Sequence, residues 1–320
     1  MSIIKEKLKL SILLVTYNHQ HYLRQALDSL FQQRLDGPIE IVVADDRSTD
    51  NTFSIIQEYE GCDSRFIFKY LDNNENVGIT KNYQRGFSAC TGKYIAVLEG
   101  DDYWISPFKL QKQVEFLDTH WECNLCSVNY FVFQEAIAHY YPRIAIGNAH
   151  RLISARELIT DNIVGNFSTC MYRKSALENL PQALYETTSY DWIINICVAR
   201  DSLIGFLETP MSVYRLHTSG TWTQKSNVEK LQQQLDLIPT YDALTNQVFH
   251  ETFENLASQL RNSIVGSQIN NALIDYVVPT VKGLSNLKDF IPPIVLMVIN
   301  LLLPPIFKRL LMKILKGRSV

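Results

Sequence analysis

Two adjacent carboxylates, Asp101 and Asp102, directly follow the apolar run 94–98 and Glu99-Gly100 in this 320-residue chain. A β-branched and aromatic run of this length is typical of a buried strand, so the acids would lie at the rim of a sheet, where open α/β sheets bind ligands. Paired carboxylates suit a divalent cation such as Mg²⁺, which completes its shell with substrate phosphates. Alternatively, the acids form a turn that caps the helix starting near Ser106-Pro107, and they alone do not decide between the two.

Polar residues follow two earlier apolar runs in the same way. The run at 10–15 leads into Thr16-Tyr17-Asn18-His19, and the run at 39–44 leads into an acidic turn over residues 45–50. One side chain of that turn would cap the next helix, which explains one of its acids but not three. Side chains capable of chemistry therefore follow three separate strands.

These strands alternate with segments of helical periodicity. Apolar residues recur every three to four positions over 22–31, a further strand is expected at 66–70, and a helix after Gly78 carries Lys81. This alternation predicts a doubly wound, mostly parallel α/β sheet of Rossmann-like topology with right-handed crossovers. In that fold the carboxyl ends of the first, second and fourth strands converge on one crevice, so their polar residues would form one site.

Composition limits the classes of function. The chain is 46% hydrophobic and 20% charged, which is typical of a globular protein, and its net charge of −3 gives no general attraction to nucleic acid. It contains no glycine-rich motif of the dinucleotide or P-loop type, so a metal and basic side chains would hold any phosphates. Scattered cysteines and the lack of a secretory segment before Leu8 favour a reducing cytosol, with Cys123 and Cys126 as buried thiols.

The second half of the chain is expected to mix strands and short helices. The predicted helices cover 107–120 and 154–161, and a further helix has an apolar face formed by Ile193, Ile194, Cys197 and Val198. The predicted strands cover 125–133, 165–173 and a pair about a proline turn at 206–217. Asp191 would lie in the first turn of the last helix, where a lone acid is more often structural than catalytic. Arg215 and His217 share one face of an extended strand, and the flanking Arg makes His217 a better candidate for binding an anion or a metal than a lone His would be.

Taken together, these residues resemble the family-2 glycosyltransferases of the GT-A fold. The similarity runs from about Lys9 to Trp222 and consists of blocks in a fixed order: Val15–Asn18, Ala44–Asp50, Asn76–Gly78 with Asn82, Ala89–Tyr94 and Leu98–Trp104. Order and spacing make this signal more specific than an acid pair alone. The resemblance implies a sugar transferase with a nucleotide-sugar donor.

The resemblance also implies where the nucleotide binds. Val15 and Tyr17 match residues that border the nucleoside base, and Asp46 matches the acid that hydrogen-bonds the base ring. Lys81 lies near a basic nucleotide contact, with a looser alignment. Asp101 matches the first acid of the metal motif, near the ribose and the sugar.

Three further positions carry the implied chemistry. Asp102 matches the ligand of Mg²⁺ or Mn²⁺ on the diphosphate, Asp191 matches the general base, and His217 matches a late polar residue near the diphosphate, a second candidate metal ligand. Tyr190 precedes Asp191 where the family often has Glu, which bears on the acceptor contact. The Gln-x-x-Arg-Trp signature of processive synthases is absent after Asp191, so a single addition is favoured.

The predicted function is therefore inverting transfer of a sugar from a UDP- or dTDP-linked donor to a hydroxyl of a glycan or lipid-linked acceptor, in bacterial cell-surface polysaccharide synthesis. Metal-assisted departure of the diphosphate and one carboxylate base fit a single displacement. Two alternatives remain. A nucleotide-sugar pyrophosphorylase would need a glycine-rich basic loop where Thr16–His19 stands, and a non-catalytic scaffold that binds sugar nucleotides would not need Asp46, Asp102 and Asp191.

The expected domains are a tail at 1–8, a GT-A domain at 9–225 (nucleotide half 9–104, acceptor half 105–225), a helical extension at 226–288 and a membrane-associating segment at 289–320. The last segment is apolar, with proline pairs, and ends in a basic amphipathic helix suited to an anionic leaflet. It predicts a cytoplasmic protein attached peripherally to the inner face of the plasma membrane. The alternative is a core or dimer helix, and hence a homo-oligomer.

Overall fold

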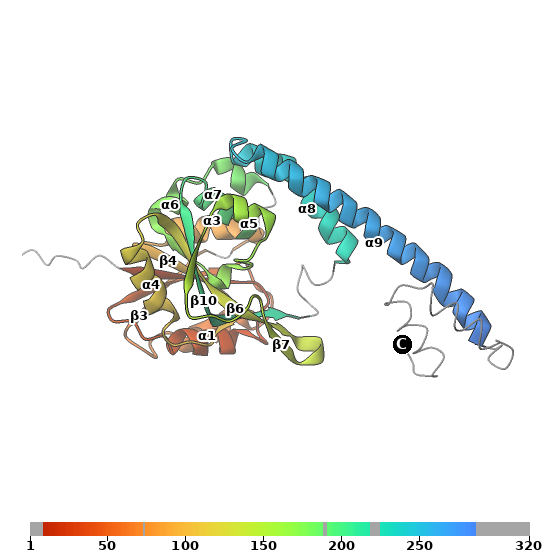
Figure 1. Ribbon diagram of the computed structural model, residues 1–320. Helices are drawn as coiled ribbons and strands as arrows, with labels where there is room; N and C mark the ends of the chain where they lie inside the picture. Colours follow the sequence, from red (N-terminus) through yellow and green to blue (C-terminus); the bar gives the residue numbers. More distant parts are fainter. Residues whose placement is uncertain (1–8, 73, 188–190, 218–224, 286–320) are drawn as a thin grey trace, which may run out of the picture. The chain divides into compact units, whose positions relative to one another are not determined.

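The computed structural model describes residues 9–72, 74–187, 191–217 and 225–285 (Figure 1). Strands and helices alternate in its amino-terminal half, as the sequence predicts. The elements are β1 (Leu10–Thr16), α1 (Leu23–Phe31), β2 (Ile39–Asp45), α2 (Thr52–Tyr59), β3 (Phe66–Tyr70), α3 (Ile79–Ala89) and β4 (Tyr94–Glu99). β1 lies between β2 and β4 and pairs in parallel with both, and β3 pairs in parallel with β2.

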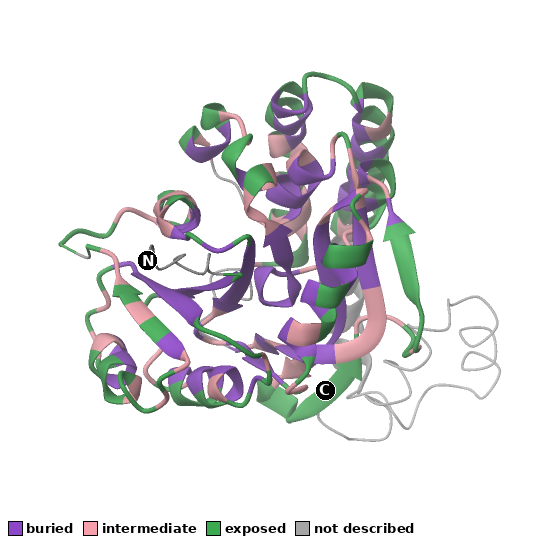
Figure 2. Cartoon of the chain, turned by 90° about the vertical axis from the view of Figure 1, so that its left-hand side faces the viewer, coloured by how far each residue is buried: buried purple, intermediate pink, exposed green. Residues whose placement is uncertain are grey.

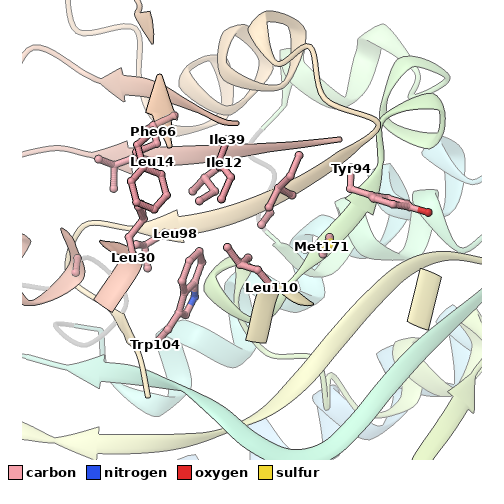
Figure 3. Close-up of a cluster of buried hydrophobic side chains, with 14 of the residues drawn as sticks. Ile12, Leu14, Leu30, Ile39, Phe66, Tyr94, Leu98, Trp104, Leu110 and Met171 are labelled. Atoms are coloured by element: carbon pink, nitrogen blue, oxygen red, sulfur yellow. The ribbon is translucent and has the colours of Figure 1, made fainter. Parts of the chain in front are cut away.

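Packing of α1 against this sheet forms the core. Every residue of β1 and β2 is buried, which explains why both strands are nearly continuous apolar runs. Figure 2 shows the buried residues along the strands and the exposed ones on the outer faces of the helices. The buried stripe of α1 meets the sheet in the cluster drawn in Figure 3, which includes Ile12, Leu14, Leu30, Ile39 and Leu98.

A close backbone contact fixes the start of β4. Gly92 N donates to Ser11 Oγ at 2.8 Å, and a Cβ at position 92 would lie 2.5 Å from the Ser11 nitrogen and 2.6 Å from the Leu10 carbonyl carbon. These are main-chain atoms of the central strand, which cannot move aside as a flexible side chain can. Glycine is therefore needed here for β4 to lie beside β1.

The second half of the sheet is mixed. Its elements are β5 (Tyr103–Trp104), α4 (Lys109–Thr119), β6 (Cys123–Gln134), β7 (His139–Pro142), β8 (His150–Ile153), α5 (Ala155–Thr160), β9 (Met171–Arg173), α6 (Lys174–Glu178), α7 (Asp191–Val198) and β10 (Leu203–Leu216). The sheet order is β3-β2-β1-β4-β9-β6-β10-β5, with β7 beside β6 and β8 beside β10. The predicted α/β class with a mostly parallel open sheet is confirmed.

The segment 165–173 is only partly a strand, contrary to the sequence prediction. Residues Phe167–Thr169 form a 3-10 turn, and only β9 is extended. Thr169 Oγ1 donates to the Asn166 carbonyl at 2.8 Å, which closes the turn and prevents strand pairing there. The turn places Ser168 against β4, where its hydroxyl accepts from the Glu99 amide at 3.0 Å.

The segment 206–217 is one strand, so the predicted strand pair about a proline turn is wrong. β10 runs through Pro210 without reversing direction. Its register with β6 shifts between Leu207 and Pro210 and again between Pro210 and Ser212. An irregularity of this kind accommodates a residue without an N–H group. The strand therefore stays extended as far as Leu216, next to the acidic turn after β4.

Two helices follow, α8 (Asn227–Leu244) and α9 (His250–Ser285). The described residues divide into two compact units, one formed by those up to 225 together with 236–257 and the other by 226–235 together with those from 258 on. Residues 236–257 thus belong with the sheet domain, whereas the sequence places the boundary at 225. The reason is packing, since the Tyr241 ring lies 5.8 Å from that of Trp192. The expected membrane-associating segment, 289–320, lies outside the described residues, and none of the helices within them is long and apolar enough to cross a membrane.

Candidate active site

The carboxyl ends of β1, β2 and β4 lie side by side, as the sequence predicts. The Asp46 amide donates to the Thr16 carbonyl at 3.0 Å, and the Gly100 amide donates to the Val15 carbonyl at 2.9 Å. These bonds continue the two parallel ladders past the ends of the strands. The residues that follow each strand therefore share one edge of the sheet.

The turns after β1 and β2 are joined by side-chain hydrogen bonds. Asn18 Oδ1 accepts from the Thr49 amide at 2.7 Å, and the Asn18 amide donates to Ser48 Oγ at 2.9 Å. Asn18 and Arg47 both have positive φ, 55° and 61°, so each turn folds back sharply on itself. Tyr17 lies on this rim with 46% of its surface exposed, whereas Val15 is buried.

Asp46 holds the loop before α3. Its Oδ1 accepts from the Val77 amide at 2.8 Å and its Oδ2 from the Gly78 amide at 3.0 Å. Asp46 is itself only 4% exposed, so the block at 76–78 is fixed against the end of β2. Lys81 follows on the first turn of α3 as an exposed side chain. A contact of Asp46 or Lys81 with a nucleotide remains a prediction.

The two carboxylates of the acidic turn after β4, those of Asp101 and Asp102, have different partners. Asp101 Oδ2 lies 3.0 Å from His217 Nε2 and 3.7 Å from His19 Nε2. Asp102 is buried, and its Oδ1 accepts from the Arg215 amide at 2.9 Å. His217 therefore pairs with Asp101, and Asp102, the expected metal ligand, keeps one carboxylate oxygen without a protein partner.

The electrostatics of the two acids differ accordingly. Burial acts to raise the pKa of Asp101, but the His19 and His217 imidazoles outweigh it and lower that pKa. Burial, together with the neighbouring charge of Asp101, raises the pKa of Asp102 well above its usual value. A cation bound at the free oxygen of Asp102 would stabilise the charged form of this carboxylate.

Within the described part of the chain, no group of three or more His, Cys, Asp or Glu side chains is arranged to hold a metal ion. The donors at this edge nevertheless fit an ion that binds together with a nucleotide. Mg²⁺ takes one or two carboxylates and completes its shell with water and phosphate oxygens. The unpartnered Oδ2 of Asp102 is such a donor.

Asp191 is the first residue of α7 and belongs to the same region. Its Oδ2 is buried without a hydrogen-bond partner. Burial raises its pKa to about 7, against the opposing effects of the Trp192 amide and the Asn162 side chain. The charge of Asp191 also helps to raise the pKa of Glu99, after the larger effects of burial, Asp102 and Asp101. A carboxyl group with a pKa near neutrality is suited to accept a proton in catalysis.

Unpartnered buried polar atoms of Thr16 and His19 lie close to the acidic turn. A Cβ at Gly100 would lie 2.8 Å from Thr16 Oγ1 and 2.9 Å from His19 Nδ1, so both atoms face the acidic turn closely. Buried polar groups in folded proteins are normally hydrogen-bonded, and such a gathering indicates a site for a polar ligand or water. Among the described residues, the buried side-chain atoms without a hydrogen-bond partner are Thr16 Oγ1, His19 Nδ1, Asp102 Oδ2, Asn166 Nδ2 and Oδ1, Asp191 Oδ2, Ser212 Oγ and Asp242 Oδ1, the last of which lies on α8.

Several of these positions do not stand out in the sequence. Glu99 accepts from the Tyr83 hydroxyl at 2.7 Å, and Asn166 is 4% exposed with its whole amide group unpartnered. The small-residue run around Gly165 points to an opening at this place but not to Asn166 itself. Two surface hollows, of about 450 Å³ beside α1 and α2 and about 340 Å³ beside α4, β8 and β10, contain none of the predicted site residues.

The sequence of this chain is similar to those of known glycosyltransferases. The family profile described as glycosyl transferase family 2 matches residues 11–180. An uncharacterised protein of Mycobacterium tuberculosis is 34% identical over 217 residues, which are 67% of this chain and 60% of that protein. The putative teichuronic acid biosynthesis glycosyltransferase TuaG of Bacillus subtilis is 34% identical over 107 residues, 33% of this chain and 41% of TuaG. The match thus spans less than two thirds of either relative.

Solved structures resemble the fold. Staphylococcus aureus TarS 1–349 in complex with UDP-GlcNAc has a TM-score of 0.57 at 18% identity, covering 77% of this chain and 73% of TarS. The mannosyltransferase PcManGT from Pyrobaculum calidifontis in complex with GDP-Man and Mn²⁺ has a TM-score of 0.53 at 13% identity, covering 86% and 81%. At these identities the likeness establishes a shared GT-A-type architecture alone.

Proposed function

Because the chain belongs to glycosyl transferase family 2, we propose that it moves a sugar from a UDP- or dTDP-linked donor to a hydroxyl of a glycan or lipid-linked acceptor. One observation carries the proposal. Asp102 and Asp191, which the family resemblance assigns to the metal and to the base, each keep a buried carboxylate oxygen without a protein partner. Neither oxygen caps a helix or forms an ion pair.

The donor would bind along the edge formed by β1, β2 and β4. Val15 and Tyr17 would border the base, with the Tyr17 ring exposed for contact with it. Each carboxylate oxygen of Asp46 accepts a loop amide, and Arg85 Nη2 lies 3.7 Å from Oδ1, so Oδ2 would offer its second lone pair to a base N–H group. Lys81 would lie near the nucleotide and Asp101 near the ribose and sugar.

Asp102, with His217 as the second candidate, would hold Mg²⁺ or Mn²⁺ together with the diphosphate. The bound ion supplies Lewis-acid stabilisation of the departing diphosphate. Asp101 keeps the His217 ring in place through its 3.0 Å contact with Nε2. The complexes of TarS with UDP-GlcNAc and of PcManGT with GDP-Man and Mn²⁺ support a nucleotide-sugar and metal requirement by analogy of fold.

Asp191 would take the proton from the acceptor hydroxyl. Its pKa of about 7 leaves the carboxylate able to accept a proton near neutral pH. With one base and no second carboxylate nucleophile assigned, the acceptor displaces the diphosphate in a single step that inverts the anomeric carbon. NMR of the product tests this directly, since a retained configuration would contradict it.

The donor can be identified without knowing the acceptor. A ligand that binds only the folded chain raises its unfolding temperature, so a thermal-shift screen of nucleotide sugars, with and without Mn²⁺, should select UDP or dTDP sugars in the presence of the ion. Equal shifts by all nucleotides, independent of Mn²⁺, would count against a donor site at this edge.

The acceptor would be assembled at the cytoplasmic face of a membrane, in cell-surface polysaccharide synthesis. The support is sequence alone: residues 289–320 combine an apolar stretch with a basic amphipathic end that contains Lys308, Arg309, Lys313, Lys316 and Arg318. The name of TuaG, which refers to teichuronic acid biosynthesis, agrees with such an acceptor for that relative.

A further inference from the structure

Arg215 lies at the junction between the acidic turn and the rest of the site. It is the second-last residue of β10 and is 8% exposed. Its Nε donates to the Asp101 carbonyl at 2.9 Å, and its main-chain amide donates to Asp102 Oδ1, also at 2.9 Å. A single residue therefore bonds to both members of the acid pair, once through its side chain and once through its backbone.

Three aromatic rings enclose the guanidinium. Its central carbon lies 4.9 Å from the centre of the Tyr22 ring, 5.3 Å from that of Tyr103 and 5.6 Å from that of Phe133. These rings come from the start of α1, from β5 and from β6. Cation–π contacts offset the loss of hydration and fix the plane of the guanidinium, a role that Arg performs better than Lys.

The remaining contacts of the guanidinium are also within the protein. Nη2 donates to Gln25 Oε1 on α1 at 2.6 Å, and Nη1 lies 3.9 Å from Glu135 Oε1 beside β7. All of these contacts direct the Arg215 side chain to groups of the protein. The guanidinium thus links the acidic turn to α1 and to the segment beside β7.

We propose that Arg215 is a positioning residue for Asp102, the carboxylate expected to bind the metal, and for the neighbouring Asp101. The amide bond to Oδ1 orients the Asp102 carboxylate, and its Oδ2 is left without a protein partner. The Nε bond fixes the backbone of Asp101, whose side chain meets His217 two residues beyond Arg215. Partners that orient metal ligands typically change metal affinity by about 10–100-fold when they are removed. The inference rests on the proposed function, since it concerns the same ion.

The test uses the full chain with Arg215→Lys and Gln25→Ala, and binding of Mn²⁺ in the presence of UDP is followed by electron paramagnetic resonance. Lys keeps the charge and the main-chain bond to Asp102, but it lacks the planar fork that ties the end of β10 to the Asp101 carbonyl and to Gln25 together. The acid pair then loses its fixed place, so Mn²⁺ affinity should fall by about 10–100-fold. Gln25→Ala removes one guanidinium partner and should give a smaller loss in the same direction. Turnover should show a raised Mn²⁺ requirement that excess ion partly rescues.

Arg151→Met is the matched control. Arg151 also lies over a ring, that of Phe206 at 5.5 Å, and also contacts a carboxylate, Glu208 Oε1 at 3.1 Å, but both partners lie outside the acidic turn. Its loss should leave Mn²⁺ binding unchanged. If Arg215→Lys remains folded and binds Mn²⁺ with UDP as the unmodified chain does, the inference is wrong. If the unmodified chain binds neither, the proposed function itself fails.

Discussion

At the scale of single residues, Asp191 shows how the surroundings set the chemistry. As a helix-terminal acid it would normally be ionised and stabilised by the helix dipole. Here burial dominates, raises its pKa to about 7 and leaves Oδ2 without a partner. The position could be predicted from the sequence through the family resemblance, but the shifted pKa could not, because it depends on packing around α7.

The first prediction concerns the pH dependence of turnover. If Asp191 is the base, kcat/KM should rise with pH as its carboxyl ionises and should level off above about pH 7, because only the ionised form accepts a proton. Asp191→Asn should lower kcat by about 10²–10⁴-fold and remove this limb of the profile. If a folded Asp191→Asn variant keeps the same rise of kcat/KM with pH as the unmodified chain, Asp191 is excluded as the base.

A second prediction concerns stability. The Asp191 carboxyl keeps its proton up to about pH 7 in the folded chain, whereas the ordinary pKa of an aspartate is 3.8. Between these values the folded state binds more protons than the unfolded state, so stability falls as pH rises. Asp191→Asn should therefore raise the unfolding temperature at about pH 8 and change it little at about pH 4. Calorimetry at both pH values measures this, and an equal shift at both would contradict it.

At the scale of elements, burial decides which predictions are correct. β1, β2 and β4 are buried almost throughout and follow the apolar runs of the sequence closely. The segment 165–173 also contains small and apolar residues, but the Thr169 hydroxyl bonds to local carbonyls and closes a turn. Pro210 indicates a turn when only the sequence is considered, because the sequence does not show that β10 takes up extra residues around Pro210 while β6 stays regular beside it.

A third prediction tests the β1–β4 contact. Gly92→Ala places a methyl group 2.5 Å from the Ser11 nitrogen, so the two strands must separate. We expect a loss of roughly 2 kcal/mol or more, seen as a lower midpoint of urea unfolding of the sheet domain. Gly266→Ala is the control, because a Cβ there meets nothing within 4 Å. Equal midpoints for the Gly92→Ala variant and the unmodified chain would show that the contact carries no constraint.

A fourth prediction concerns the loop before α3. Asp46→Ala removes the acceptors of the Val77 and Gly78 amides and leaves both without these bonds. UDP binding should weaken by about tenfold or more, because the loop loses its fixed place and the base loses its acid. Isothermal titration measures the affinity, and hydrogen exchange of residues 76–78 should increase in the same variant. Unchanged exchange would show that Asp46 does not hold the loop.

At the scale of the whole molecule, the fold class follows from the sequence. The convergence of three strand ends follows too, because parallel strands bring their carboxyl ends to the same edge of the sheet. The contacts that complete the site do not follow, since they join distant residues: Gln25 and Arg215 are 190 positions apart. The boundary expected at 225 differs from the compact units for the same reason, because α8 includes residues whose packing partners lie on α7.

A fifth prediction concerns the carboxyl-terminal segment. The full chain should sediment with anionic vesicles at low salt, and a chain lacking 288–320 should remain in the supernatant. Replacing the five basic residues of the tail by Gln should weaken vesicle binding but leave the apolar contribution. If the full chain stays in solution at low salt without detergent, membrane attachment through this segment is excluded.

The most direct test of the central claim separates the two carboxylates. Asp102→Asn and Asp191→Asn are compared with the unmodified chain for Mn²⁺-dependent UDP binding and for release of UDP from a UDP-sugar in the presence of a glycan acceptor. The account predicts that both variants lose turnover, that Asp191→Asn still binds UDP with Mn²⁺ at nearly full affinity, and that Asp102→Asn loses the Mn²⁺-dependent part of binding. Folded variants that retain turnover, or an Asp102→Asn chain whose Mn²⁺-dependent binding is intact, would contradict it.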